Sequence, residues 1–232
     1  MSIAENIKHI RQQMNEAALA AGRDPRSILL CAATKMNDAN NVRQAIASGV
    51  DCCGENRVQE LVVKQAEHAY DGAPVHFIGH LQTNKVKQVV GKVSLIQSVD
   101  SLRLLDAINK EAAKQKIVQD ILLEINIGRE ESKSGFDPSE IHQICEKMCE
   151  YSNVRMLGFM AIPPICQNSS ENRKFFQEIY NLSVDITAKK YDNVWVNILS
   201  IGMSDDYREA IACGSTMIRV GTAIFGARDY TH

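Results

Sequence analysis

The sequence predicts an α/β fold, a single (β/α)8 TIM barrel with an extra N-terminal helix, and two observations carry this prediction. Eight short apolar runs alternate with longer segments of helical spacing, and no Pro/Gly-rich linker or composition break divides the 232 residues. Near-continuous apolar strands that alternate with helices are typical of a parallel sheet covered on its outside. Barrels of this class commonly reach this length undivided, so we expect residues 1–232 to form one domain.

The elements follow in a regular order. The opening segment MSIAENIKHIRQQM has no apolar secretory core and is expected to form an amphipathic helix. Strands are then expected at 28–34, 50–53, 75–79, 95–99, 120–127, 154–160, 195–201 and 216–220. Helices are expected between them, for example at 138–152 and at 101–118, where Leu102, Leu105 and Ile108 share one face. The second strand is short and polar, and a doubly wound open sheet is the competing fold.

Composition narrows the class of protein. Hydrophobic residues at 45% and charged residues at 23% are ordinary for a soluble globular chain. The net charge of -2 gives no reason to expect nucleic acid or an acidic membrane as partner, and no apolar stretch approaches the length that crosses a bilayer. The seven cysteines have no framework spacing and are interpreted as reduced thiols of a cytoplasmic protein. Cys145 and Cys149 would share a helix face, but no second pair accompanies them, so we expect core packing and no metal.

Lys35 is the first candidate functional residue, because barrel chemistry takes place at the carboxyl ends of the strands. It closes the first predicted strand, and strand alternation puts it on one face with Leu29, Cys31 and Ala33. If that face points into the barrel, the amine lies at the mouth beside two small side chains. Burial favours the neutral form of a lysine, which is the form that attacks an aldehyde. The alternative is a lysine that has left the strand and reaches solvent, and position alone does not separate the two.

Arg219 is the second candidate. It lies inside the apolar run MIRV at 217–220, where an unpaired charge would cost free energy. It therefore needs a partner. That partner is either an acidic residue on a neighbouring strand, with Glu124 and Glu55 as the candidates, or an atom of a ligand.

Two glycine-containing loops follow the last two predicted strands. One runs from Ser200 to Ser204 into a helix that is expected to begin near Asp205, and the other is Gly221-Thr222. Barrels often bind phosphate with the loops after strands seven and eight, using backbone amides, hydroxyls and a helix N-terminus. Glycine lets the backbone approach the phosphate oxygens.

The simpler interpretation of this polar rim is that strand-to-helix loops are polar in any protein. On that interpretation Asp100-Ser101 and Ser204-Asp205-Asp206 are helix caps, and we expect capping for them. In combination, however, an aldehyde-reactive lysine, a buried arginine and a phosphate-binding pair of loops would engage a phosphorylated aldehyde with a ring nitrogen.

Several long motifs occur in order along the chain, from about residue 5 to residue 228. They are CGENRVQE (53–60), HFIGHLQTNKVK (76–87), INIGREESKSGF (125–136), GFMAIPP (158–164) and LSIGMSDD with AIACGSTMIRVGTAIFGAR (199–228). With these motifs the sequence resembles the YggS/PROSC family of pyridoxal 5'-phosphate (PLP) homeostasis proteins, whose fold is similar to the barrel domain of alanine racemase. The resemblance implies that the chain binds PLP as a Schiff base.

By position, the resemblance assigns the Schiff-base lysine to Lys35, the asparagine close to the cofactor ring to Asn56 and the arginine that faces the pyridine nitrogen to Arg219. The phosphate-binding residues that it implies are Ser200, Ser204, Gly221 and Thr222. The segment CAATKMN departs from the family, which more often has a serine before the lysine and a proline soon after it. Because the lysine itself is retained, the departure concerns the shape of the loop.

The resemblance also bears on catalysis. An arginine opposite the pyridine nitrogen tends to keep that nitrogen unprotonated, which makes the ring a weaker electron sink than it would be beside a carboxylate. Racemisation further needs proton transfer on both faces of the α carbon, and in barrel racemases a tyrosine from a separate C-terminal domain serves the second face. Here the chain ends at His232, and Tyr207 is the only tyrosine near a strand end. We expect no second base.

The sequence therefore predicts a non-catalytic, monomeric PLP-binding protein that buffers the cofactor or passes it to apo-enzymes. The alternative from the enzyme class is an amino-acid racemase or lyase that uses the same lysine. A third hypothesis is a PLP-independent Schiff-base aldolase.

Overall fold

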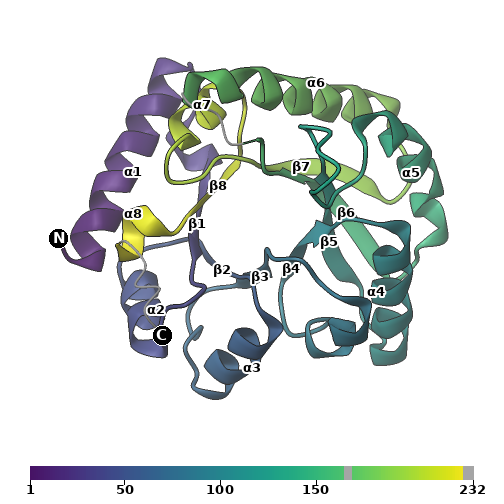
Figure 1. Cartoon of the computed structure of the whole chain (residues 1–232), viewed down its shortest axis with the longest axis horizontal. Coiled ribbons are helices and arrows are strands. Elements are labelled where there is room, and N and C mark those ends of the chain that lie inside the picture. Colours follow the sequence, from purple (N-terminus) through teal and green to yellow (C-terminus); the bar gives the residue numbers. More distant parts are fainter. Residues whose placement is uncertain (165–168, 227–232) are drawn as a thin grey trace.

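The computed structural model describes residues 1–164 and 169–226 and contains a closed parallel barrel of eight strands (Figure 1). The strands are β1 (Leu29–Ala33), β2 (Cys52–Glu55), β3 (Val75–Phe77), β4 (Leu95–Val99), β5 (Gln119–Ile125), β6 (Val154–Ala161), β7 (Val194–Ser200) and β8 (Met217–Val220). Each strand pairs in parallel with the next, and β8 pairs with β1. The predicted barrel is confirmed, and this closing pair excludes the open sheet.

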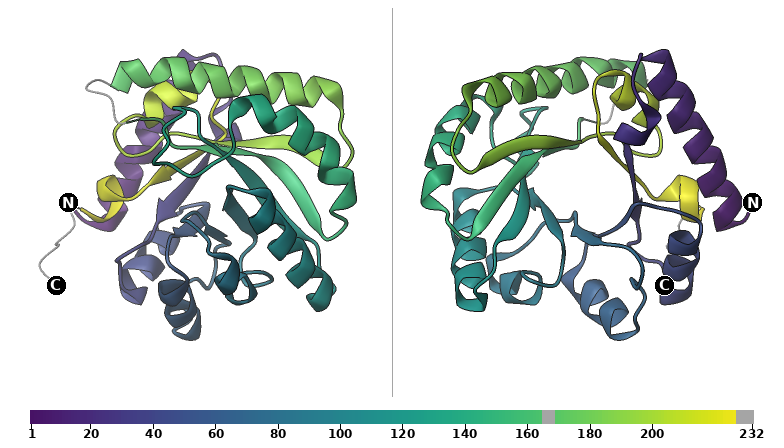
Figure 2. Two further views of the ribbon diagram at one scale, coloured as in Figure 1. Left: turned by 45° about the vertical axis from the view of Figure 1, so that its right-hand side comes forward. Right: turned by 180° about the vertical axis from the view of Figure 1, so that it is seen from behind.

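Helices cover the outside of the barrel (Figures 1 and 2). They are α1 (Ile3–Ala20), α2 (Ala39–Ala47), α3 (Val58–Ala66), α4 (Leu102–Gln115), α5 (Ile141–Lys147), α6 (Arg173–Lys189), α7 (Tyr207–Ala212) and α8 (Thr222–Phe225). Short 3-10 segments lie between these elements: η1 (Pro25–Ser27), η2 (Thr83–Gln88), η3 (Pro138–Glu140), η4 (Met148–Glu150) and η5 (Ser169–Asn172). The extra N-terminal helix α1 packs against α7 and α8 (Figure 1).

The core has two parts, because successive strand residues point to opposite faces. The larger part lies between the strands and the helices and includes Leu30 and Ala32 of β1. The smaller part fills the barrel interior, where Cys31, Cys52 and Met217 form one cluster. A second interior cluster contains Leu95, Leu122 and Met160, and the half-buried Ile198 packs against both clusters.

Two residues further along four of these strands, the inward positions become polar. Gln97 follows Leu95 on β4, and Glu124 follows Leu122 on β5; Ser200 follows Ile198 on β7, and Arg219 follows Met217 on β8. The barrel interior thus changes from apolar to polar toward the carboxyl ends of the strands, which is where barrel proteins place their chemistry.

Some predicted element ends shift for local reasons. The helix expected at 101–118 ends at Gln115, because Lys116 adopts a left-handed conformation with φ of 55°. Its predicted cap is confirmed, since the Ser101 hydroxyl accepts a hydrogen bond from the Leu104 amide at 3.3 Å. The helix expected at 138–152 is divided into η3, α5 and η4.

The capping predicted at Ser204-Asp205-Asp206 is wrong. Helix α7 begins at Tyr207, and Asp206 makes no side-chain hydrogen bond to it. The Asp206 carboxylate instead accepts hydrogen bonds from the Met203 amide at 2.7 Å and from the Asn172 amide group at 2.8 Å, so it braces the preceding loop.

The two cysteines on α5 and η4 differ in burial. Cys145 is buried in the core as predicted, but Cys149 is exposed, so the expected core packing is wrong for Cys149. Cys166 lies outside the described residues. Within the described part of the chain, no helix combines the length and apolar character that crossing a membrane requires.

The contact between β6 and β7 requires glycine at position 158. Gly158 has a φ of 142°, and a Cβ atom there would lie 1.9 Å from the carbonyl oxygen of Ile198. We therefore expect Gly158→Ala to lower the free energy of unfolding, measured by urea denaturation, by about 3 kcal/mol or more. Gly49 is the matched control, because its φ is 90° but a Cβ atom there would meet nothing within 4 Å. Gly49→Ala should cost only about 1–2 kcal/mol; equal losses in the two variants would contradict the steric explanation.

Candidate functional site

A cavity of about 460 Å³ opens at the carboxyl ends of the strands. Its walls are formed by Ala33, Lys35, Asn56, Ile78, Ile162, Met203, Ser204, Asp205, Arg219, Gly221 and Thr222. Six of the seven residues predicted to hold a cofactor therefore share one cavity, although the sequence separates the first from the last by most of the chain. The seventh, Ser200, does not line it.

Lys35 lies two residues beyond β1, where its side chain is half-buried. The predicted face is confirmed, because Cys31 lies inside the barrel and Ala33 lines the cavity, while Leu30 and Ala32 pack outward. Lys35 itself lines the cavity, which favours the predicted direction over a lysine directed only to solvent.

The segment after Lys35 is the one that departs from the family pattern, and it forms a tight turn. The Asn37 amide donates to the Thr34 carbonyl at 3.1 Å, and Met36 has a left-handed φ of 61°. This conformation is costly for a residue with a long side chain. The Met36 amide donates to a Glu60 carboxylate oxygen at 2.7 Å, and such charge-assisted bonds are strong enough to hold the turn.

A buried ion pair supports this side of the cavity. The Glu55 side chain is fully buried, and its Oε2 accepts hydrogen bonds from Lys64 Nζ at 2.7 Å, Tyr70 Oη at 3.0 Å and Thr34 Oγ1 at 3.2 Å. Its Oε1 accepts from the Asn56 amide at 2.9 Å. These hydrogen bonds hold the backbone at Thr34 and Asn56. Removal of one partner of the ion pair would leave a buried charge unpaired. The sequence analysis did not identify Lys64. It lies four residues after an acidic residue, a spacing that is typical of an ion pair on the surface of a helix.

The Asn56 side chain carries an unmet acceptor. Its Oδ1 is buried and has no hydrogen-bond partner, while the residue lines the cavity. Gly79 packs closely behind it, since a Cβ at position 79 would lie 2.2 Å from the Asn56 carbonyl oxygen. A buried polar atom without a partner calls for an explanation, and a ligand donor in this cavity would supply one.

Arg219 is held by oxygen atoms of two neighbouring strands. Its Nη1 donates to the Ser200 carbonyl at 2.6 Å and to the Ser200 hydroxyl at 2.7 Å, and its Nη2 donates to the Ala161 carbonyl at 3.1 Å. Burial lowers the pKa of this guanidinium below its ordinary value. The Nε–H is engaged by none of these three acceptors, and the residue reaches the cavity wall.

The acidic partner predicted for Arg219 is wrong at the level of direct contact. Within the described residues, Arg219 forms no ion pair within 4 Å, because Glu55 pairs with Lys64 and Glu124 acts on Arg219 only through its field. Backbone carbonyls accept hydrogen bonds from a buried guanidinium but do not neutralise its charge. The cavity therefore keeps a fixed positive charge. The other partner predicted for Arg219, an atom of a ligand, stays a prediction.

Ser200 lies behind Arg219 and begins a chain of hydrogen bonds across the interior. Its hydroxyl donates to Gln97 Oε1 at 2.7 Å, and Gln97 Nε2 lies 2.9 Å from His76 Nδ1. Burial lowers the pKa of His76 to about 4, so this imidazole is neutral at pH 7.

The two glycine-containing loops meet at the cavity. The Thr222 hydroxyl donates to the Ser204 hydroxyl at 3.0 Å, which joins the loop after β7 to the loop after β8. Gly202 has a φ of 92°, and a Cβ there would lie 2.5 Å from the Cβ of Ala210, so this position requires glycine. Its carbonyl accepts from the Arg219 amide at 3.0 Å.

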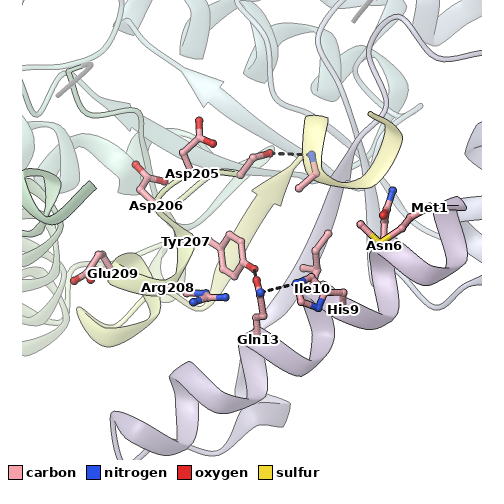
Figure 3. Close-up of a pocket in the computed structure, with 12 residues that line it drawn as sticks. Met1, Asn6, His9, Ile10, Gln13, Asp205, Asp206, Tyr207, Arg208 and Glu209 are labelled. Carbon is pink, nitrogen blue, oxygen red and sulfur yellow. Dashed lines mark hydrogen bonds between the residues drawn. The ribbon is translucent and has the colours of Figure 1, made fainter. Parts of the chain in front are cut away.

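A second cavity, of about 700 Å³, lies beside α1 and shares Ser204 and Asp205 with the smaller one (Figure 3). The buried Tyr207 points its hydroxyl toward Gln13 of α1 and donates a hydrogen bond to it. Tyr207 is thus turned away from the smaller cavity. None of the tyrosines that the structure describes lines the smaller cavity, and Tyr230 lies outside the described residues. The larger cavity has no lysine in its wall, so we assign the candidate site to the smaller one.

Glu124 adds a titratable group at the barrel mouth. Burial and, to a smaller extent, the charge of Asp100 raise its pKa to about 7, while the charges of Arg219 and His80 oppose the shift. Sequence reasoning named Glu124 only as a partner for Arg219. Its inward position, two residues after Leu122, is the sequence feature that could have identified it as a residue of the site.

The raised pKa of Glu124 predicts a pH dependence of stability. Between its ordinary value of 4.5 and about 7, the folded protein keeps a proton that the unfolded chain has lost, so the free energy of unfolding falls as pH rises. The size of this loss is on the order of 3 kcal/mol. In the cofactor-free protein, Glu124→Gln should remove this loss. Urea denaturation at a series of pH values should then show the free energy of unfolding of the variant rising relative to that of the wild type from pH 4.5 to 7. The exposed Glu131→Gln is the control; a pH-independent difference for Glu124→Gln would contradict the assignment.

Comparison with known proteins agrees with this geometry. Residues 2–229 match the alanine racemase N-terminal domain family, so the chain belongs to this family. It is 40% identical to a pyridoxal phosphate homeostasis protein of Aquifex aeolicus, over 99% of this chain and 100% of that protein. The resemblance that the motifs predict is thereby confirmed.

Solved structures show the same fold. An unknown protein from Bifidobacterium adolescentis superposes with a TM-score of 0.89 at 35% identity, over 96% of this chain and 94% of that one. PipY of Synechococcus elongatus, solved with PLP bound, superposes with a TM-score of 0.82 at 30% identity, over 97% of this chain and all of PipY.

Proposed function

We propose that this chain binds PLP in the 460 Å³ cavity, holds it as a Schiff base on Lys35 and serves PLP homeostasis by buffering the cofactor or passing it to apo-enzymes. The observation that carries the proposal is that Lys35 and the buried cation Arg219 line one cavity. The PLP bound to PipY and the homeostasis role named for the Aquifex relative support it.

The residues fit this cofactor on chemical grounds. PLP supplies an aldehyde that condenses with an amine, and a pyridine ring that withdraws electrons. Lys35 provides the amine at the cavity wall, and the unmet Asn56 Oδ1 provides an acceptor beside it. Arg219 provides a donor that does not give up its proton, so a pyridine nitrogen facing it stays an unprotonated acceptor.

The phosphate group would lie at the meeting point of the two loops. The hydroxyls of Ser204 and Thr222 are already hydrogen-bonded to each other, and Gly221 leaves its backbone accessible there. The solvent-exposed Asp205 also lines this wall, and its charge would weaken the binding of a phosphate. A phosphate contact for Ser200 stays a prediction, because its hydroxyl is engaged by Arg219 and Gln97. We propose that Ser200 acts on the site by holding Arg219.

We further propose that the chain has no strong catalytic activity of its own. A weak electron sink beside Arg219 and the turn of Tyr207 toward α1 both support this proposal. The apo-enzymes as partners, the cytoplasmic location and the monomeric state stay predictions.

Absorption spectroscopy tests the Schiff base on Lys35. The purified protein with PLP should absorb in the visible range, and borohydride followed by peptide mass analysis should leave the reduced adduct on the peptide that contains Lys35. Lys35→Ala should lose the band and retain at least tenfold less cofactor after dialysis, while the control Lys85→Ala should match the wild type. A full band in Lys35→Ala would refute the assignment. A protein that stays colourless with PLP would favour the aldolase hypothesis instead.

Incubation with amino acids tests the absence of strong catalysis. The PLP-loaded protein should leave single-enantiomer amino acids optically pure over many cofactor equivalents, because the described residues offer no tyrosine at the second face of the α carbon. Chiral chromatography measures the outcome, with a Lys35→Ala sample as the blank. Sustained turnover that depends on Lys35 would establish the racemase alternative.

A further inference from the structure

Three chemically reactive side chains meet in the barrel interior, apart from the cofactor cavity. Cys31, Cys52 and His76 come from the consecutive strands β1, β2 and β3 and are all buried. Their two Sγ atoms and a ring nitrogen of His76 all lie within 4.8 Å of one another. Cys31 and Cys52 are direct partners in the register of β1 and β2, so the barrel itself brings the thiols together. None of the three lines the cavity in which we place PLP.

This arrangement is close to what a tetrahedral metal ion requires. Bonds of about 2.3 Å to sulfur and about 2.0 Å to nitrogen place neighbouring ligand atoms about 3.5–3.8 Å apart. The observed upper limit of 4.8 Å is about 1 Å longer, which small rotations about the side-chain bonds can close. Two thiolates and an imidazole form a donor set that binds Zn(II) and Cu(I) in preference to hard cations.

The surroundings supply a further donor and an orienting group. Met217 packs against Cys31 and Cys52 in the same interior cluster, which brings a thioether to the two thiols. The Gln97 amide nitrogen lies 3.2 Å from Met217 Sδ and 2.9 Å from His76 Nδ1. Metal-binding histidines donate their other ring N–H to an acceptor, so metal binding through His76 Nε2 requires the Gln97 amide to turn its oxygen toward Nδ1.

We propose that Cys31, Cys52 and His76 bind one thiophilic metal ion, Zn(II) or Cu(I), inside the barrel, with the Met217 thioether as a fourth donor to Cu(I). On binding, each thiol loses a proton to solvent and forms a metal–sulfur bond, and the neutral imidazole donates its lone pair. With Zn(II) the two thiolates cancel the charge of the ion, so the complex adds no net charge to the apolar interior. The proposed ligands include none of the residues assigned to PLP, so the proposal does not rest on the proposed function, although hydrogen bonds through Gln97 and Ser200 connect His76 to Arg219.

The chain offers a matched control for the thiols. Cys53 is adjacent to Cys52 and equally buried, but it points outward into the core between barrel and helices. A change at Cys53 therefore disturbs packing to a similar degree without removing a ligand.

Cobalt titration of the full-length, reduced and PLP-free protein tests the site. Co(II) should produce a thiolate-to-cobalt charge-transfer band that saturates at one equivalent and disappears when Zn(II) displaces it. Cys31→Ala and Cys52→Ala should each weaken Co(II) binding at least tenfold, whereas Cys53→Ala should bind as the wild type does. Absence of the band in the wild type, or a full band in Cys31→Ala and Cys52→Ala, would overturn the proposal.

Alkylation of the wild type makes the test independent of how well the variants fold. One equivalent of Zn(II) should protect Cys31 and Cys52 from a thiol reagent at least tenfold under mildly denaturing conditions, while the exposed Cys149 stays reactive. Equal labelling of Cys31 and Cys52 with and without Zn(II) would refute the site. For Cu(I), Met217→Leu should weaken binding several-fold and leave Co(II) binding unchanged; unchanged Cu(I) binding would refute the fourth donor.

Discussion

The hydrogen bonds of the buried Arg219 guanidinium are the interaction on which the site depends. They join β8 to the ends of β6 and β7 through the Ala161 and Ser200 carbonyls, and the Ser200 hydroxyl continues the chain to Gln97 on β4 and His76 on β3. An isolated buried charge would be costly, and carbonyl acceptors offset much of that cost. Because no carboxylate contacts Arg219 within the described residues, its charge stays available to the cavity.

A second network holds the opposite wall. The pair of Glu55 with Lys64 fixes Thr34 and Asn56, the two residues that flank the predicted lysine along the chain and across the sheet. Lys35 and Arg219 are thus positioned by separate hydrogen-bond networks on either side of one opening. Preorganisation of this kind lowers the conformational cost of binding a ligand. It suits the reversible cofactor binding that we propose.

Strand periodicity made the barrel and the inward face of Lys35 predictable, because alternation along β1 decides where each side chain points. The contacts of the charged residues were not predictable to the same degree. Arg219 bonds to backbone carbonyls, which have no sequence signature. Lys64 is buried by the packing of α3 on the barrel, and its sequence spacing is that of a surface helix residue. The cluster of Cys31, Cys52 and His76 arises only when the barrel register brings three separate strands together.

A crystal structure of the protein grown with PLP tests the central claim most directly. We predict continuous density from Lys35 Nζ into the cofactor, the pyridine nitrogen facing Arg219, and the phosphate between the Ser204 and Thr222 hydroxyls and the Gly221 backbone. The Arg219 bonds to Ser200 and Ala161 should be retained, because they are already formed without the cofactor. Cofactor density in the larger cavity beside Tyr207, or no link to Lys35, would contradict the account.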